Sequence, residues 1–177
     1  IETDHLVVFP YPNQLPEEAL GRADVVWVGG GSVANLLALW RVHGIDDAMR
    51  DAWERGVVLG GVSAGSICWH VGGTTDSFGP DLRPVTNGLG LLPYGNGVHY
   101  DSEQQRRPLV HALVADGTLP TSFATDDRIG ILYEGTEPIE VIADVDADPQ
   151  ASPAAYRVEL VAGSVVETRL PIGPVTA

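Results

Sequence analysis

Lysine is absent from this 177-residue chain, and cysteine occurs once, at Cys68. Without lysine the chain has neither an amine for Schiff-base chemistry nor the lysine of a phosphate-binding P-loop. A single cysteine excludes an internal disulfide framework and a zinc site built on paired cysteines. No apolar run reaches the roughly 18–20 residues of a membrane-spanning helix, so the sequence predicts no membrane partner.

Positive charge is also scarce, because 10 basic residues stand against 24 acidic ones and give a net charge of −14. Proteins that bind nucleic acids neutralise phosphates with clustered Lys and Arg, so we expect no nucleic-acid partner. The chain is 44% hydrophobic and 19% charged, which is typical of a folded protein. Its length suits one domain over residues 1–177.

The first two-thirds of the chain alternates between strand and helix patterns. Val25–Val28 and Val57–Val62 are apolar runs that we expect to be strands buried on both faces, as in a parallel sheet. Ser32 can cap a helix that begins at Val33 and stops at Gly44. Further elements are expected as a strand at Leu6–Phe9, a helix between Asp46 and Gly56, a helix of about two turns after Ser63, a loop over 72–97, a short strand at Val98–Tyr100 and a helix from Pro108 to Asp116.

The last third of the chain has a different pattern, which predicts short strands joined by turns. The sequence therefore predicts an α/β fold with a mostly parallel sheet flanked by helices, flavodoxin-like in kind, to which antiparallel hairpins are added at the C-terminal end. The expected strands are Ser122–Ala124, Ile129–Tyr133, Ile139–Val145, Tyr156–Val161 and Val165–Arg169.

The segment Gly61-Val62-Ser63-Ala64-Gly65 fits the pattern G-x-S-x-G between a buried strand and a helix. This is the context of a nucleophile elbow, in which a tight turn lifts the serine hydroxyl above the end of the strand. The backbone N–H of Ala64 would point to where an oxyanion forms, and the turn Gly29-Gly30-Gly31 could supply a second donor. The plainer interpretation is a glycine-rich turn whose serine only caps the helix.

A serine nucleophile needs a base, and His99 is the favoured candidate because it ends a short strand beside the polar stretch from Tyr100 to Gln105. His70 is expected on the helix after the elbow, too far from Ser63 for a direct hydrogen bond. The acid that orients the imidazole could be Asp76, Asp126 or Asp127. On the residues alone all three remain open.

The sequence resembles peptidase family S51, the dipeptidase E and cyanophycinase group. The resemblance lies in the strand, triple-glycine and helix pattern from Ala23 to Leu37, in the elbow at Gly61–Ser66, in Thr74-Thr75-Asp76 and in the region of His99. It implies a class I glutamine-amidotransferase-like fold, with Ser63 as the nucleophile and His99 as the base. It also implies a further β–α region before Ile1. Because the chain does not begin with Met, we expect that this segment is missing here.

The family leaves two candidates for the acid, and we favour Asp126 because its segment leaves a strand beside the expected site, with Asp76 as the alternative. The family's oxyanion hole falls on Ala64 and on Gly30 or Gly31. Its aspartyl dipeptidases bind an N-terminal Asp through an arginine. Here Arg106 or Arg107 could take that role through a bidentate fork, although Glu103 stands near the expected position.

The sequence therefore predicts a serine exopeptidase, a dipeptidase acting on short peptides, with no metal or cofactor. The expected location is cytoplasmic, and monomer and homodimer remain open. Gly29-x-Gly31-x-x-Ala34 also fits a loose dinucleotide fingerprint, so a nucleotide- or NAD-binding domain is an alternative. Two further alternatives remain. One is an α/β-hydrolase esterase, and the other is a non-catalytic binding module with the predicted peptidase fold.

Overall fold

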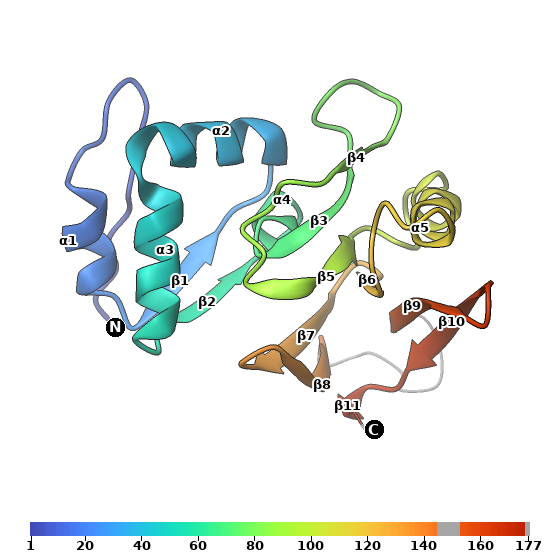
Figure 1. Ribbon diagram of the computed structural model, residues 1–177. Coiled ribbons are helices and arrows are strands. Elements are labelled where there is room, and N and C mark those ends of the chain that lie inside the picture. The colour runs from blue at the N-terminus through green and yellow to red at the C-terminus, as the bar shows by residue number, and fades with distance from the viewer. Residues whose placement is uncertain (145–152, 176–177) are drawn as a thin grey trace.

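The computed structural model describes residues 1–144 and 153–175. In this part of the chain the strands form three sheets (Figure 1). One sheet pairs β1 with β2, a second has six strands in the order β10-β9-β6-β5-β3-β4, and a third has the order β11-β8-β7. The strands are β1 Val25–Val28, β2 Val58–Gly61, β3 His70–Thr75, β4 Arg83–Val85, β5 Leu92–Gly97, β6 Ser122–Thr125, β7 Ile129–Glu134, β8 Glu137–Ala143, β9 Ala155–Val161, β10 Ser164–Leu170 and β11 Gly173–Pro174.

Helices cover one face of the first sheet, and α5 lies beside the second (Figure 1). The helices are α1 Pro16–Gly21, α2 Val33–His43, α3 Ile45–Glu54, α4 Ala64–Ile67 and α5 Arg106–Ala115. The start and stop signals of α2 act as the sequence predicts. The Ser32 side chain accepts a hydrogen bond from the Asn35 N–H at 3.3 Å, and Gly44 closes the helix in the left-handed conformation with φ 68°.

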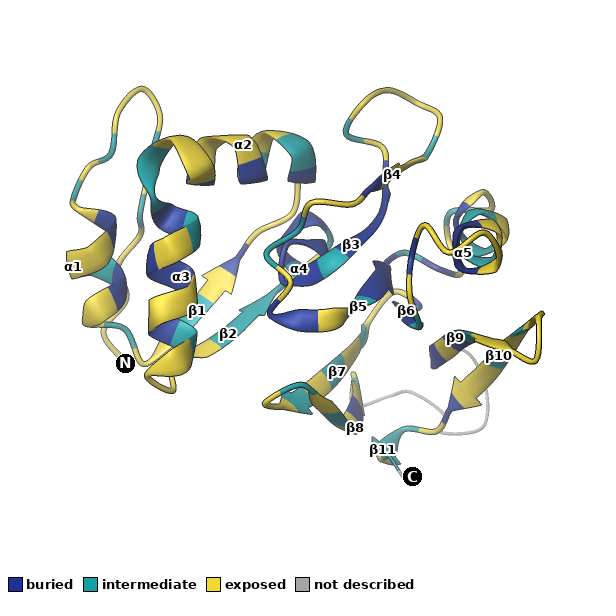
Figure 2. Ribbon diagram, in the orientation of Figure 1, coloured by how far each residue is buried: buried dark blue, intermediate teal, exposed yellow. Residues whose placement is uncertain are grey.

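Parallel strands β1 and β2 are buried on one face only (Figure 2). Val28 is buried, whereas Val25, Trp27 and Val58 are exposed, Trp27 to 69%. The expectation that these strands are buried on both faces is therefore wrong for the described chain. The helices cover one face, and no described element covers the other.

The segment expected as a loop over 72–97 contains most of β3 and all of β4 and β5, which belong to the six-stranded sheet. Its glycines, which suggest a loop in the sequence, are required by close packing. A Cβ at Gly72 would lie 2.1 Å from the Val85 carbonyl oxygen, and one at Gly73 would lie 2.3 Å from that of Asn96. These residues are glycine because neighbouring backbones approach too closely for a side chain.

Some other expected elements also differ. Leu6–Phe9 forms no strand, because Val7 pairs its backbone groups locally with Asn13. Helix α4 has four residues instead of two turns, so His70 begins β3 rather than lying on a helix. Strand β5 ends at Gly97, before the strand expected at Val98–Tyr100. Val145, the expected end of one C-terminal strand, lies outside the described residues.

The α/β class and the C-terminal hairpins are confirmed, and the parallel part is narrower than expected. Of the eight strand pairings in the described chain, the three parallel ones join β1 to β2, β3 to β5 and β5 to β6. The parallel strands β2 and β5 are the ones that lead into Ser63 and His99. Among residues 1–144 and 153–175, no helix is long and apolar enough to cross a lipid bilayer.

Candidate active site

Ser63 lies in a tight turn between β2 and α4, with φ 57° and ψ −115°. Non-glycine residues rarely adopt this backbone conformation, which marks strain at the position. A Cβ at Gly61 would lie 2.2 Å from the Gly65 carbonyl oxygen, and one at Gly65 would lie 2.2 Å from that of Val28. The G-x-S-x-G pattern thus has a steric cause, and it holds the turn against β1.

The His99 imidazole contacts this serine, with Nε2 3.1 Å from Ser63 Oγ. His99 follows β5 and also has a positive φ, 52°. Its side chain is 32% exposed, so solvent and small molecules reach the pair. The structure therefore brings together the two side chains that the sequence singles out as nucleophile and base.

The second imidazole nitrogen contacts Asp127, with 2.6 Å between Nδ1 and Oδ1. Hydrogen bonding from His99 and then from Ser102 holds the pKa of the Asp127 carboxyl below its ordinary value. This contact requires Nδ1 to carry the proton, which leaves Nε2 as an acceptor toward Ser63. Hydroxyl, imidazole and carboxylate thus form one hydrogen-bonded series.

Asp126, the acid favoured from the sequence, faces away from this series. It is 2% exposed, and its Oδ2 accepts hydrogen bonds from the Ala154 N–H at 2.8 Å and the Tyr156 hydroxyl at 3.4 Å. Burial raises its pKa above the ordinary value. Asp126 follows β6 directly and pairs with Ala154 through its backbone N–H and its carboxylate, so its side chain turns into the protein, whereas Asp127 lies in the turn that follows and reaches His99.

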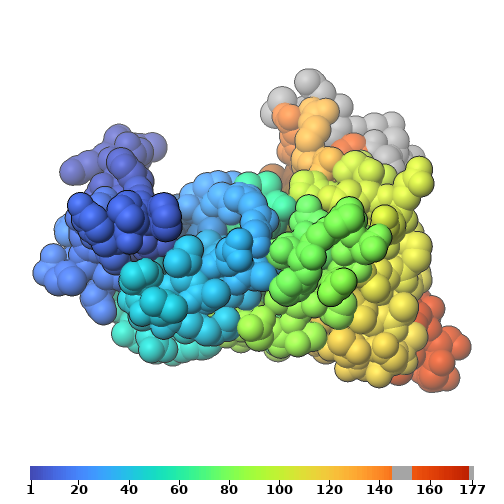
Figure 3. All heavy atoms as spheres, turned by 90° about the horizontal axis from the view of Figure 1, so that it is seen from above, coloured from blue at the N-terminus to red at the C-terminus, as the bar shows by residue number. Residues whose placement is uncertain are grey.

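Asp76, the alternative acid, lies beside the pair but does not contact His99. It lines an open cavity of about 330 Å³ whose walls also include the serine and the imidazole. The lining residues are Gly31, Ser32, Ser63, Asp76, Ser77, His99, Glu103 and Arg106. Figure 3 shows the segment after β3, in green, between the light-blue α2 and the yellow α5. Ser32, Ser77 and the position of Glu103 in the wall could not be deduced from the sequence, because they depend on how these segments meet.

The glycines expected at the oxyanion site approach the elbow. A Cβ at Gly30 would lie 3.4 Å from the Ser63 Cβ, and Gly31 lines the cavity. In the described chain, the N–H groups of Gly31 and Ala64 donate to no protein acceptor. Backbone donors without partners beside a reactive hydroxyl are what an oxyanion hole requires.

Neither arginine expected to bind substrate presents a free guanidinium. Arg106 lines the cavity but is 2% exposed, and it donates to the Thr74 carbonyl and hydroxyl and to Glu103, at 2.5 Å for the latter. Arg107 does not line the cavity. It lies against the rings of Tyr100 and Tyr156.

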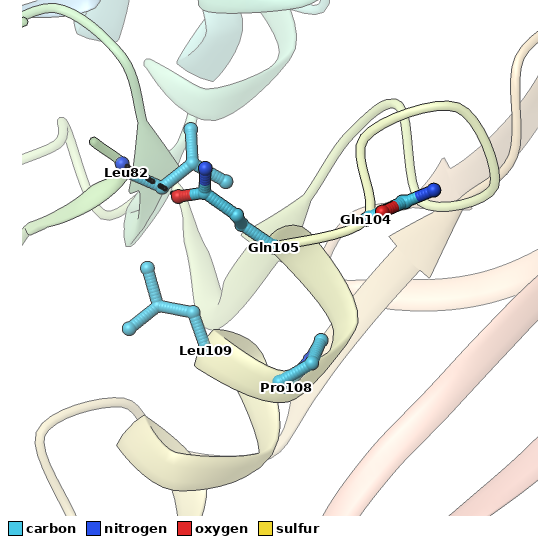
Figure 4. Close-up of a pocket in the computed structure, with 5 residues that line it drawn as sticks. All are labelled: Leu82, Gln104, Gln105, Pro108 and Leu109. Atoms are coloured by element: carbon cyan, nitrogen blue, oxygen red, sulfur yellow. Dashed lines mark hydrogen bonds between the residues drawn. The ribbon is translucent and has the colours of Figure 1, made fainter. Parts of the chain in front are cut away.

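A larger hollow of about 590 Å³ adjoins the start of α5 (Figure 4). Its lining residues are Leu82, Gln104, Gln105, Pro108 and Leu109, and the Gln105 side chain accepts a hydrogen bond from the Leu82 N–H at 3.5 Å. It contains no titratable side chain. The serine and the imidazole line the smaller cavity instead.

Cys68 and His70 lie beneath the elbow and take no part in the cavity. Cys68 is fully buried, and burial raises the pKa of its thiol. Its assignment as a small core residue agrees with the structure. Among residues 1–144 and 153–175, no group of three or more His, Cys, Asp and Glu side chains is placed to hold a metal ion.

A serine at a strand-to-helix elbow, hydrogen-bonded to a histidine that contacts a carboxylate, is the arrangement of serine hydrolases. The family model for peptidase family S51 matches residues 1–141. The chain belongs to peptidase family S51 and is a serine-type peptidase.

Two relatives agree with this assignment. The Bacillus subtilis (strain 168) protein named uncharacterized peptidase YgaJ is 36% identical over 168 residues, which cover 95% of this chain and 70% of that protein. Peptidase E of Shewanella denitrificans (strain OS217) is 32% identical over 90 residues, 50% of this chain and 38% of that protein. A solved glutamine amidotransferase structure aligns with 72% of this chain and 69% of its own, at 17% identity and a TM-score of 0.39.

Proposed function

We propose that this chain hydrolyses the peptide bond of short peptides, dipeptides among them, with Ser63, His99 and Asp127 as its catalytic residues. The 3.1 Å contact between His99 Nε2 and Ser63 Oγ is the observation that carries the proposal. The cavity volume of about 330 Å³ lies at the lower end of the ~300–1,000 Å³ of small-molecule sites, which favours a short peptide.

In the first step His99 Nε2 takes the proton of the Ser63 hydroxyl as Oγ attacks the scissile carbonyl carbon. The carbonyl π electrons move to oxygen, and the tetrahedral intermediate carries the negative charge there. The Ala64 N–H, with that of Gly30 or Gly31, is the proposed donor set for this oxygen. Asp127 stabilises the imidazolium that forms.

The intermediate collapses when the carbon–nitrogen bond breaks and the protonated His99 gives its proton to the leaving amine. The peptide's acyl group then remains as an ester on Ser63. Water, deprotonated by the same imidazole, attacks this ester. The bond between the acyl carbon and Ser63 Oγ then breaks, the carboxylic acid leaves, and His99 returns its proton to Oγ. Each proton that His99 accepts is returned, so the enzyme ends unchanged.

The test compares Ser63→Ala with the parent chain on a dipeptide panel. Loss of the nucleophile should lower kcat by at least about 10³-fold, and a fluorophosphonate probe should modify the parent chain at Ser63 but not the variant. Ser164→Ala, at an exposed position on β10, is the matched control and should behave as the parent. Unchanged hydrolysis by Ser63→Ala would overturn the proposal.

A further inference from the structure

The cavity beside Ser63 contains one carboxylate with no protein partner. Asp76 is exposed and lines the cavity, yet its side chain makes no hydrogen bond or ion pair with any residue in the described chain. His99 contacts Asp127, so the proposed mechanism leaves Asp76 without a role.

Strand register explains why Asp76 lies next to the reacting groups. In the parallel pairing of β3 with β5, Gly73 is opposite Asn96. Asp76 comes three residues after Gly73, and His99 comes three residues after Asn96, so both lie at the same edge of the sheet. Adjacent strands are about 4.8 Å apart, so the two residues are close neighbours.

Hydrogen bonds of the neighbouring residue hold the loop that carries Asp76 in place. The next residue, Ser77, accepts a hydrogen bond from the Ala34 N–H at 3.3 Å and shares a 2.7 Å hydrogen bond with the Thr75 hydroxyl. These contacts join the loop to the start of α2 and to the end of β3. Asp76 therefore projects from a held backbone.

The other charges in the cavity wall cancel. Glu103 and Arg106 form an ion pair at 2.5 Å, and Arg106 also donates to Thr74. The Arg106 Nε has no partner, but it is fully buried and cannot meet a substrate. The net charge that the cavity offers to a ligand is that of Asp76, which is negative.

We propose that Asp76 binds the free α-ammonium group of the peptide's N-terminal residue, so that the enzyme acts on peptides with an unblocked N-terminus. This inference rests on the proposed function. A carboxylate and an ammonium group form a charge-assisted hydrogen bond, and the held loop keeps Asp76 at one distance from Ser63. An N-terminal Asp side chain would find no free cation in this wall and would face Asp76, so the site disfavours it.

The first experiment measures kcat/KM for Ala-Ala, N-acetyl-Ala-Ala and Asp-Ala. The parent chain should prefer Ala-Ala to the acetylated peptide by about 10- to 100-fold, the worth of one charge-assisted hydrogen bond. It should also prefer Ala-Ala to Asp-Ala. In Asp76→Asn the ratio of free to acetylated peptide should fall toward one, and Asp76→Glu should recover part of it.

Substrate protonation provides an independent readout. An α-amino group has a pKa of about 8, so kcat/KM of the parent chain for Ala-Ala should fall as pH rises above that value. In Asp76→Asn this fall should be absent. Asp81→Asn, an exposed carboxylate that follows β3 but does not line the cavity, is the matched control and should keep the parent's ratio and pH profile.

The outcomes separate this inference from the proposed function. If Ser63→Ala is inactive but Asp76→Asn keeps the parent's ratio, or loses activity equally on both peptides, the assignment of Asp76 is wrong. If Ser63→Ala hydrolyses Ala-Ala normally, the proposed function fails instead. Calorimetric binding of the two peptides to Ser63→Ala requires no turnover, and equal affinities for them there would overturn the role of Asp76.

Discussion

The Asp101 side chain accepts a hydrogen bond from the backbone N–H of Asp127, with 2.9 Å between Oδ1 and N. Asp101 lies two residues after His99, and Asp127 contacts the imidazole of His99. Two hydrogen bonds therefore join the loop after β5 to the loop after β6. One runs from the Asp127 N–H to the Asp101 side chain, and the other joins the Asp127 side chain to His99. In the proposed mechanism Asp101 is therefore a positioning residue, because its side chain contacts Asp127 and not the imidazole.

Removing this contact should weaken catalysis without removing any catalytic group. Asp101→Ala should lower kcat by about tenfold, the equivalent of one hydrogen bond, with a smaller effect on KM. Asp101→Asn retains an acceptor oxygen and should recover most of the rate. The proton resonance of the imidazole Nδ1–H, measured by NMR, should shift in the alanine variant and return in the asparagine variant.

A surface carboxylate with the same kind of contact serves as the control for Asp101. Asp116 accepts a hydrogen bond from the Thr118 N–H at 2.9 Å, at the end of α5. Asp116→Ala should leave kcat and the imidazole resonance unchanged. An equal loss of activity in both alanine variants would show that Asp101 acts only through general stability.

The two neighbouring aspartates should separate catalysis from stability. Asp127→Asn removes the charge that stabilises the imidazolium and should lower kcat by about 10²- to 10⁴-fold with little change in the free energy of unfolding. Asp126→Ala should do the reverse. It should lower the free energy of unfolding by about 1–3 kcal/mol, because it leaves the Ala154 N–H and the Tyr156 hydroxyl without their buried acceptor, and leave kcat of the folded enzyme near that of the parent.

Steady-state kinetics and urea unfolding measure these two effects. If Asp126→Ala lost kcat while Asp127→Asn retained it, the orientation of both side chains in the structure would be contradicted.

The elbow should reject even one methyl group at Gly65. In Gly65→Ala the new Cβ would lie 2.2 Å from the Val28 carbonyl oxygen, so β1 or the elbow must move. We expect the free energy of unfolding to fall by at least about 2 kcal/mol, and the fluorophosphonate to react more slowly with Ser63. Gly130→Ala, where a Cβ meets nothing within 4 Å, should change stability by less than about 0.5 kcal/mol.

His70 should make the protein less stable in mild acid. Burial lowers the pKa of His70 from 6.5 to about 4, and its Nδ1–H donates to the Ser66 carbonyl at 2.9 Å. Above pH 6.5 neither the folded nor the unfolded state is protonated at this residue. As pH falls from 6.5 toward 4, only the unfolded state gains the proton, so the stability that the neutral ring provides is progressively lost.

The free energy of unfolding, measured by urea titration between pH 7 and pH 4, should therefore decrease with a slope of up to about 1.4 kcal/mol per pH unit from this residue. His70→Gln keeps a donor for the Ser66 carbonyl but does not titrate in this range, and it should flatten the slope. A slope as steep in His70→Gln as in the parent would assign the acid sensitivity to other groups.

The sequence predicts the α/β class and the proximity of Ser63 and His99, because each depends on a local pattern with a steric cause. An elbow requires small residues at fixed spacing around the serine, and a histidine after a strand of the sheet reaches the same edge. No local sequence pattern distinguishes Asp126 from Asp127 as the residue that contacts His99. Two adjacent residues of the same type differ only in the side of the chain that they face, which is set by the pairing of Asp126 with Ala154.

The glycine-rich strands β3 and β5 were the main feature that the sequence could not predict. Glycine usually marks a turn, and the tight packing that requires it at Gly72 and Gly73 becomes visible only when the neighbouring strands are in place. The net charge of the cavity wall also depends on contacts that form only when the chain folds. Arg106 appears in the sequence as a free cation, but folding neutralises it with Glu103.

The sealed position of Cys68 makes the molecule convenient for site-directed spectroscopy. The only native sulfhydryl is shut away from solvent, so maleimide or methanethiosulfonate reagents would find no reactive group on the folded protein. A cysteine introduced at a chosen surface position would carry the reporter alone. Movement of the loops around the cavity could then be followed without first replacing Cys68.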